Sequence, residues 1–214
     1  MANIIDLTYP LSPQTVMFPG FPQPEITPFY TIEKEGANVS RINFVSHVGT
    51  HIDAPRHMLV GTRTVDELPL EWLIGEAVVV DISGRENPAI ISLADLQGHD
   101  HAIHPGDILL MITGVYKVYG TPAYNEAYPA LTTDAANWLV KKEIAAYATD
   151  ATSIEVPGSS GNPAHKILLG GEIPIIENLC NLERISQPRV RFICLPLKVK
   201  DGDGGPCRVV VIED

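Results

Sequence analysis

The stretch His47-Val-Gly-Thr-His51-Ile-Asp53-Ala-Pro-Arg-His57 sets the interpretation of the whole chain. It gathers three of the chain's seven histidines and one carboxylate into residues 47–57. Imidazole nitrogens and carboxylate oxygens, without any thiolate, are ligands typical of zinc, manganese or iron sites that carry out hydrolysis. The pattern therefore predicts a divalent-metal site, and a histidine-rich surface loop is the alternative.

The backbone of this stretch suits neither a regular helix nor a flat strand. Gly49 and its β-branched neighbours disfavour a helix, and Pro55 prevents one from continuing. In a flat strand, at about 3.3 Å per residue, the Cα atoms of His47 and His51 would lie roughly 13 Å apart, too far for most side-chain orientations to share one metal. Gly49 has no Cβ and can bend the chain. We therefore expect a strand end that breaks into a tight loop.

The motif resembles the His-x-Gly-Thr-His-x-Asp-x-Pro-x-His signature of the cyclase-like metal-dependent hydrolases, the family of bacterial kynurenine formamidase and isatin hydrolase. Every defined position of that signature is matched, by His47, Gly49, Thr50, His51, Asp53, Pro55 and His57. The resemblance implies a swivelling β/β/α-type fold, with a mixed sheet or open barrel and flanking helices.

Composition narrows the class of protein and its partners. The length of 214 residues predicts a single domain, residues 1–214. The net charge of −11 argues against nucleic acid or an anionic membrane surface as a partner. No apolar run is long enough to span a bilayer, and the start, Met-Ala-Asn-Ile-Ile-Asp, lacks a signal-peptide pattern. Cys180, Cys194 and Cys207 have no Cys-x-x-Cys spacing, which predicts buried free thiols in a reducing cytoplasm.

Apolar runs separated by turn residues predict alternating strands and helices, which indicates an α/β class. The predicted strands are residues 4–8, 38–46, 76–82, 107–113, 145–149 and 173–176, with further apolar stretches between 190 and 212. Ser92 and either Thr132 or Thr133 would cap helices at 93–98 and 134–142. Short helical segments are expected within 65–75 and 162–170. Prolines predict an irregular stretch at 10–28, and residues 115–130 are predicted to be a loop.

The apolar loop Val16–Pro22 carries two aromatic side chains, Phe18 and Phe21. Such a loop usually packs on something, and a core edge, a ligand and a second subunit are the alternatives. The resemblance implies that it walls the substrate pocket, of its own or of a neighbouring subunit. Phe18 stands where the family often has tryptophan, so the substrate is left open.

The C-terminal half offers further ligands. His165 is its only histidine, and Glu177 follows the predicted strand 173–176, a common position for site residues in α/β folds. The resemblance implies that His47 and His51 bind one metal ion, that Asp53 bridges, and that His165 and Glu177 bind a second. It thus implies two divalent ions per subunit, zinc or manganese. His57 and Glu177 are the expected catalytic residues, with His57 as the proton shuttle.

Other polar residues are predicted to lie outside the site. His99, His101 and His104 precede a strand without a carboxylate at ligand spacing, so we expect exposed, metal-free histidines. Glu172 and Glu183 are predicted to be surface charges. Asp201-Gly-Asp-Gly resembles part of a calcium loop but lacks the glutamate at the twelfth position, which favours a Gly-rich turn between two strands. By the resemblance, Arg208 would support the site from behind.

These expectations lead to a metal-dependent hydrolase that cleaves a small amide or cyclic amide with metal-activated water. The resemblance points first to N-formylkynurenine as the substrate and second to isatin-like lactams. A non-enzymatic metal-binding module is the alternative from another class, although an inactive relative would be expected to lose His57 or Glu177, and both are present. The expected assembly is a homodimer or homotetramer.

Overall fold

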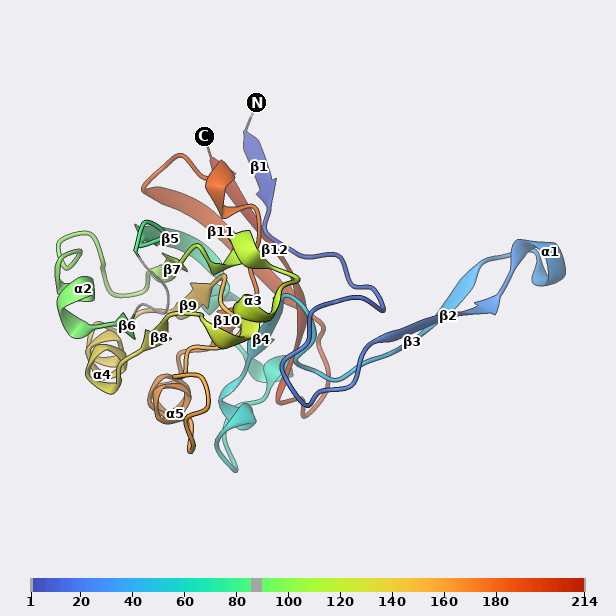
Figure 1. Ribbon diagram of the computed structural model, residues 1–214, viewed down its shortest axis with the longest axis horizontal. Coiled ribbons are helices and arrows are strands. Elements are labelled where there is room, and N and C mark those ends of the chain that lie inside the picture. The colour runs from blue at the N-terminus through green and yellow to red at the C-terminus, as the bar shows by residue number, and fades with distance from the viewer. Residues whose placement is uncertain (1, 86–89, 214) are drawn as a thin grey trace.

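A mixed sheet closed into a barrel forms the centre of the protein. The structure, a computed structural model, describes residues 2–85 and 90–213. The strands run in the order β1-β12-β11-β5-β7-β9-β10-β4, and β4 also pairs with β12, which closes the ring (Figure 1). Their bounds are β1 (Asn3–Asp6), β4 (His51–Asp53), β5 (Ile74–Asp81), β7 (Ile108–Ile112), β9 (Ala146–Thr149), β10 (Ile175–Glu177), β11 (Arg189–Pro196) and β12 (Gly204–Glu213). The predicted α/β class, with a mixed sheet or open barrel and flanking helices, is confirmed, and the barrel is closed.

One half of the barrel is parallel and is covered by helices. Strands β5, β7, β9 and β10 are parallel to one another, and α2 (Leu93–Gln97), α4 (Thr133–Lys141) and α5 (Pro163–Gly170) lie along their outer side (Figure 1). Alternate residues of β7 face opposite sides, because side chains alternate along a strand. Leu110 belongs to the core inside the barrel, and Leu109 belongs to the core under the helices. A strand buried on both faces is apolar throughout, as β7 is.

The predicted helix starts are confirmed by side-chain caps. The Ser92 hydroxyl accepts a hydrogen bond from the backbone N–H of Asp95, whose carboxylate accepts from the Ser92 backbone N–H in return. The Thr132 hydroxyl accepts from the N–H of Ala135 and so caps α4, which decides between Thr132 and Thr133.

Two regions differ in local structure from the prediction. Residues 115–130 hold a 3-10 turn η4 (Val115–Val118) and a short helix α3 (Pro122–Glu126), which begins at Pro122 because proline is tolerated in a first helical turn. The helix expected within 65–75 is instead two 3-10 turns, η2 (Val65–Glu67) and η3 (Leu70–Trp72). A 3-10 turn η5 (Leu182–Arg184) precedes β11, and a small parallel pair joins β6 (Ile90–Ile91) to β8 (Ala130–Leu131).

A two-stranded arm projects from the barrel (Figure 1). It consists of β2 (Glu25–Tyr30), a one-turn helix α1 (Ile32–Glu35) at its tip and β3 (Val39–Asn43). The prediction that residues 10–28 are irregular is therefore wrong for the last part of that stretch. Pro28 is accommodated in β2 because the ribbon has only two strands and its register shifts between Pro28 and Tyr30.

Barrel closure depends on a close approach of two backbones. Strand β4 lies between β10 and β12, with Asp53 opposite Gly204 in the register. A Cβ atom on Gly204 would stand 2.4 Å from the Ile52 carbonyl oxygen and 3.1 Å from Cε1 of His47. Glycine is therefore required there.

In the described part of the chain, no helix has the length and apolar character to cross a membrane.

We expect Gly204→Ala to destabilise the protein by about 1–3 kcal/mol, as overpacking of a tight contact usually does. Because the clash is with a backbone oxygen of β4, the substitution should also lower the metal content. Thermal melts and elemental analysis would measure both effects. Gly205→Ala is the matched control, since its Cβ would meet the Leu197 carbonyl oxygen at an ordinary 3.5 Å. Equal melting temperatures for the two variants would contradict the argument.

The predicted single domain over residues 1–214 stays a prediction.

Candidate metal centre

Two short strands bring three of the predicted ligands side by side. His51 and Asp53 lie on one face of β4, and Ile52 between them faces the barrel core. Strand β10 pairs antiparallel with β4 so that Glu177 is opposite His51. All three ligand side chains are buried, with exposed fractions of 4%, 1% and 3%. Residues far apart in the sequence therefore share one face of the sheet through pairing alone.

The bend at Gly49 brings His47 to the same place. Gly49 adopts a φ of 55°, in the left-handed region that favours glycine, and the rings of His47 and His51 lie 5.1 Å apart. Nδ1 of His51 lies 2.8 Å from the Gly49 carbonyl oxygen and donates to it, which leaves Nε2 facing the cluster. The predicted bend is confirmed. However, the bent segment lies before strand β4, whereas we expected a strand end followed by a tight loop. The 3-10 turn η1 (Pro55–His57) comes after β4.

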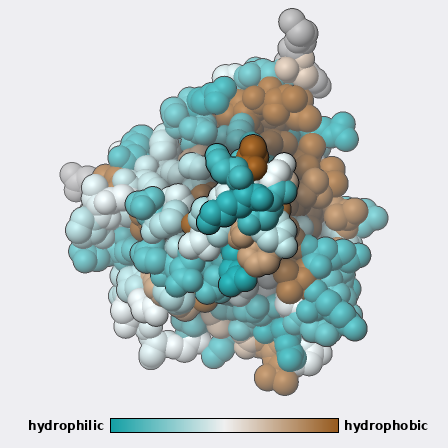
Figure 2. Space-filling model, turned by 90° about the vertical axis from the view of Figure 1, so that its right-hand side faces the viewer, coloured by the Kyte–Doolittle hydropathy of each residue, from teal (hydrophilic) through white to brown (hydrophobic). Residues whose placement is uncertain are grey.

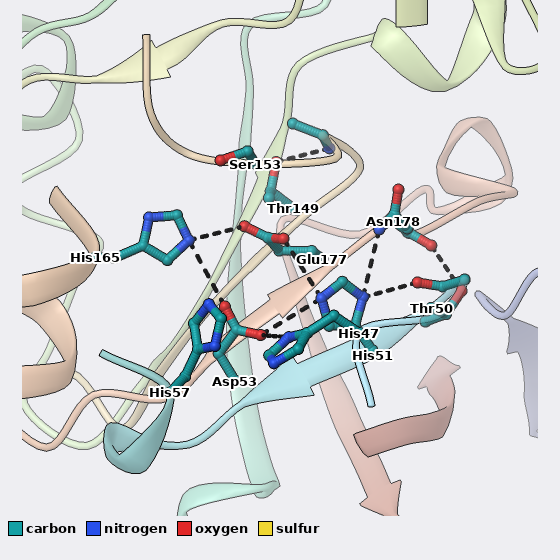
Figure 3. Close-up of polar contacts among 12 residues, drawn as sticks. His47, Thr50, His51, Asp53, His57, Thr149, Ser153, His165, Glu177 and Asn178 are labelled. Atoms are coloured by element: carbon teal, nitrogen blue, oxygen red, sulfur yellow. Dashed lines mark hydrogen bonds and ion pairs between the residues drawn. The ribbon is translucent and has the colours of Figure 1, made fainter. Parts of the chain in front are cut away.

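The two carboxylates each present one oxygen to each of two histidines (Figure 3). Nε2 of His51 is 3.4 Å from Oδ1 of Asp53 and 3.6 Å from Oε2 of Glu177. Nε2 of His165 is 3.6 Å from Oδ2 of Asp53 and 3.5 Å from Oε1 of Glu177. The arrangement therefore has two halves, one beside His51 and one beside His165, which share both carboxylates.

His165 reaches the cluster from helix α5 and is held there by Glu155. Its backbone N–H and its Nδ1 both lie within hydrogen-bond distance of Oε1 of Glu155, at 2.8 and 3.0 Å. Glu155 is itself buried. This carboxylate was missed in the sequence, although it comes after strand β9 at the same end of the sheet as Glu177, the last residue of the parallel strand β10.

A second missed carboxylate, Asp203, holds His47. Nδ1 of His47 is 2.7 Å from Oδ1 of Asp53, and its Nε2 is 2.9 Å from Oδ2 of Asp203. Asp203 lies in the turn before β12, as the Gly-rich pattern predicted, but the pattern did not reveal that its side chain faces the histidines. The glycines on either side of Asp203 were the available signal, because they permit a close backbone approach.

Burial and the neighbouring carboxylates together set the pKa values of these groups. Burial alone would lower the pKa of His47, but the carboxylates of Asp53 and Asp203 raise it to about 10. Burial likewise opposes protonation of His165, but the hydrogen bond to Glu155 and the nearby carboxylates of Glu177 and Asp53 raise its pKa to about 10. Burial raises the pKa of Glu177, and the negative charge of Asp53 raises it further. The carboxylates therefore favour positive charge at this place, as the ligands of a cation do.

His57 stands beside the cluster and faces a cavity. Its ring is half-buried, 4.0 Å from the His47 ring and 6.1 Å from the His165 ring (Figure 3). The cavity has a volume of about 300 Å³ and is lined by Phe18 and Phe21 as well as by His57. Burial lowers the pKa of His57 to about 4, below the near-neutral value expected for a proton shuttle.

Several residues lie away from the site, most of them as predicted. His101 and His104 are exposed as predicted, whereas His99 is half-buried, and Nδ1 of His104 lies 3.7 Å from Oδ2 of Asp107, a carboxylate that the prediction did not give it. None of the three belongs to a potential metal-binding group of the described residues, and their lack of metal stays a prediction. The three cysteines are free and buried. Glu172 is an exposed partner of Arg63. The expectation for Arg208 is wrong: its exposed guanidinium pairs with Asp6 on β1, because position 208 of β12 turns its side chain away from the barrel.

Comparisons with known proteins show the family of this chain. The family model described as putative cyclase matches residues 5–156. A kynurenine formamidase of Salinibacter ruber is 29% identical over 97% of this chain and 96% of its own, and one of Bacillus cereus is 30% identical over the same shares.

Solved structures are similar to this chain over nearly its whole length. A potential metal-dependent hydrolase with cyclase activity is 30% identical, with a TM-score of 0.85 over 100% of this chain and 99% of its own. Isatin hydrolase A of Labrenzia aggregata, bound to benzyl benzoate, is 25% identical, with a TM-score of 0.89 over 99% of this chain and 93% of its own. The matched family model covers more than half of the sequence, so this chain belongs to the cyclase family.

Proposed function

We propose that this protein is a metal-dependent hydrolase that cleaves the carbon–nitrogen bond of a small amide, with two zinc or manganese ions per subunit. The first ion would be held by His47, His51 and Asp53, and the second by His165, with Glu177 shared between them. Asp53 would bridge the two ions. The observation that carries the proposal is the division of each carboxylate between the His51 half and the His165 half.

The distances fit a cation better than hydrogen bonds. Four nitrogen–oxygen separations of 3.4–3.6 Å are long for hydrogen bonds. They are close to the roughly 3.4 Å between ligands of one tetrahedral ion with bonds of about 2.1 Å. Oε1 of Glu177 is buried and has no hydrogen-bond partner. A buried carboxylate oxygen without a partner is costly, and a bound cation would satisfy it.

His57 is placed to move a proton during the reaction. When bound, the metal ions would lower the pKa of a water molecule toward neutrality and polarise the substrate carbonyl. With its low pKa, His57 is neutral at pH 7 and can accept a proton from the cluster side. Its position on the cavity wall lets it deliver that proton to the leaving nitrogen.

The cavity supports a small aromatic amide as the substrate. Phe18 and Phe21 supply aromatic surface at its wall, while Ser153 and Asn162 supply polar groups. Kynurenine formamidases are similar to this chain over nearly its whole length, so N-formylkynurenine is the proposed substrate. An isatin-like lactam is the second candidate, supported by the similarity to isatin hydrolase A.

We also propose self-association, as a homodimer or homotetramer, through the projecting arm. The arm exposes apolar side chains that include Phe29, Ile32 and Ile42, and an isolated two-stranded ribbon is marginally stable in water. Figure 2 looks toward the arm and shows a further strip of apolar side chains on the body beside it. A twofold assembly would let each arm cover this strip on the other copy.

The three free cysteines support a reducing cytoplasm as the location, which cell fractionation would check.

The metal proposal predicts that both halves of the chain are needed for binding. His51→Ala and His165→Ala should each lower the metal bound per subunit, because each removes a nitrogen that both carboxylates face. Elemental analysis of purified, metal-replete protein measures this. The triple change of His99, His101 and His104 to Gln is the control and should leave the metal content unchanged. Full metal content in His165→Ala would remove the C-terminal half from the site.

The substrate proposal predicts turnover of N-formylkynurenine by the metal-replete protein, with isatin and simple formamides tested alongside. His57→Ala should retain most of the metal and lose about a hundred- to ten-thousandfold in rate, the usual cost of removing one general acid/base. Asp53→Ala should lose both metal and activity. Wild-type kcat/KM for His57→Ala would exclude its role.

The same assay tests the aromatic wall. Phe18 and Phe21 are each 41% exposed, and neither belongs to the core clusters of the described residues. Phe18→Ala should therefore lower kcat/KM while metal content and melting temperature stay close to wild type. Leu70→Ala, a truncation of another exposed apolar side chain that lies outside the cavity lining, is the control. A lower melting temperature with unchanged kcat/KM in Phe18→Ala would assign the loop to core packing.

The assembly proposal predicts a dimeric or tetrameric mass by light scattering or sedimentation. Ile42→Asp should shift the mass toward the monomer, because it places a charge on the apolar surface of the arm. Val60→Asp is the control, since Val60 is an exposed apolar residue on a different loop. A monomeric wild type would refute the proposal.

A further inference from the structure

Each histidine nitrogen that faces away from the cluster has its own acceptor. Nδ1 of His51 donates to the Gly49 carbonyl oxygen, at 2.8 Å. Nδ1 of His165 lies 3.0 Å from Glu155, and Nε2 of His47 lies 2.9 Å from Asp203. A hydrogen bond at one ring nitrogen fixes the proton there and leaves the other nitrogen free as a ligand. The two halves of the centre therefore have separate carboxylate supports.

Asp203 is held in place although its side chain is 46% exposed. Its carbonyl oxygen accepts a hydrogen bond from the Ala54 N–H at 3.0 Å, which ties the turn to the segment that carries Asp53. Its Oδ2 atom accepts from the Ser46 hydroxyl at 3.1 Å as well as facing His47. Asp203 is thus fixed by one main-chain contact and by two contacts of its carboxylate.

The position of Asp203 determines which nitrogen of His47 meets the cluster. With Nε2 engaged by Asp203, Nδ1 is directed at Oδ1 of Asp53, the oxygen that also faces His51. Without this contact, the half-exposed turn would no longer restrain rotation of the ring. Glu155 gives the equivalent support to His165 from the other side, through a different loop.

We propose that Asp203 is a positioning residue that acts through His47 and sets the affinity for the metal ion on the His51 side. Glu155 has the corresponding role on the His165 side. The inference rests on the proposed metal-dependent function and goes beyond it, since it assigns each metal position its own outer carboxylate. The two affinities can then be changed independently. The same oxygen of Asp203 also lies 3.9 Å from Nδ1 of His57, so its loss would affect the cavity side as well.

The test is the affinity for Zn²⁺ alone, measured on the purified full chain by competition with a chromophoric chelator. Asp203→Ala should lower the affinity for one bound equivalent by about 10- to 100-fold, the usual effect of removing such an outer partner. Glu155→Gln should lower the affinity for the other equivalent. Asp201→Asn is the matched control, because it removes a charge from the same turn at an exposed position. It should bind Zn²⁺ as the wild type does.

A second variant separates positioning from a general structural effect. In a His47→Ala background, Asp203→Ala should cause no further loss of affinity, because Asp203 acts through His47. If Asp203→Ala fails to fold by circular dichroism, Asp203→Asn replaces it and should show a smaller loss of affinity, since its amide oxygen can still accept a hydrogen bond.

Wild-type affinity in the Asp203 variants, or an equal loss in the His47→Ala background, would overturn this inference alone. A wild-type chain that binds neither Zn²⁺ nor Mn²⁺ would overturn the proposed function together with it.

Discussion

The burial of two neighbouring carboxylates is the constraint on which the site depends. Asp53 and Glu177 lie on adjacent antiparallel strands, almost completely removed from water. Two negative charges at this spacing in a low-dielectric interior destabilise the fold unless cations or protons compensate them. His51 and His165 approach both carboxylates without forming short hydrogen bonds, and one glutamate oxygen has no partner. The protein alone leaves this charge incompletely balanced, which is the physical reason for proposing bound divalent ions.

The closed barrel makes this burial possible. Strand β4 is only three residues long, yet it pairs with β10 on one side and with β12 on the other. Its carboxylate and imidazole are therefore fixed by two ladders of main-chain hydrogen bonds, while Ile52 anchors it in the core. Gly204 allows β12 to come close enough, and this places Asp203 next to His47. The outer carboxylate and the closure of the barrel are consequences of the same strand pairing.

The pocket wall and the arm are parts of one N-terminal segment. The loop that carries Phe18 and Phe21 leads directly into β2, the first strand of the arm. Asn125 donates a hydrogen bond to the Met17 carbonyl oxygen, and the Val16 N–H donates to the Tyr119 hydroxyl, so the loop is attached to the body at its start. Covering of the arm by another copy would therefore act on the segment that bounds the cavity. In the proposed assembly, this connection would give contacts of the arm a direct structural route to the cavity.

The sequence by itself determined the ligand chemistry and the local structure. The spacing of His47, His51 and Asp53 indicated a metal site, Gly49 indicated the bend, and Ser92 marked the start of a helix, because each of these depends on a few neighbouring residues. Apolar runs located most strands for the same reason. The resemblance of the motif to a known family, and not periodicity, supplied the barrel and the pairing of His165 with Glu177.

Only the tertiary structure decided which residues support those ligands. Asp203 and Glu155 lie in turns that the sequence did not connect with the histidines, and they reach the histidines only when β12 and α5 have packed against the barrel. Arg208 points away from the site because of its place in the alternation of β12, which a family pattern does not reveal. The arm was hidden by the prolines of residues 10–28, since a two-stranded ribbon tolerates proline where a larger sheet does not. The local chemistry of the motif depends on neighbouring residues, whereas the partners of each ligand depend on contacts between segments far apart in the chain.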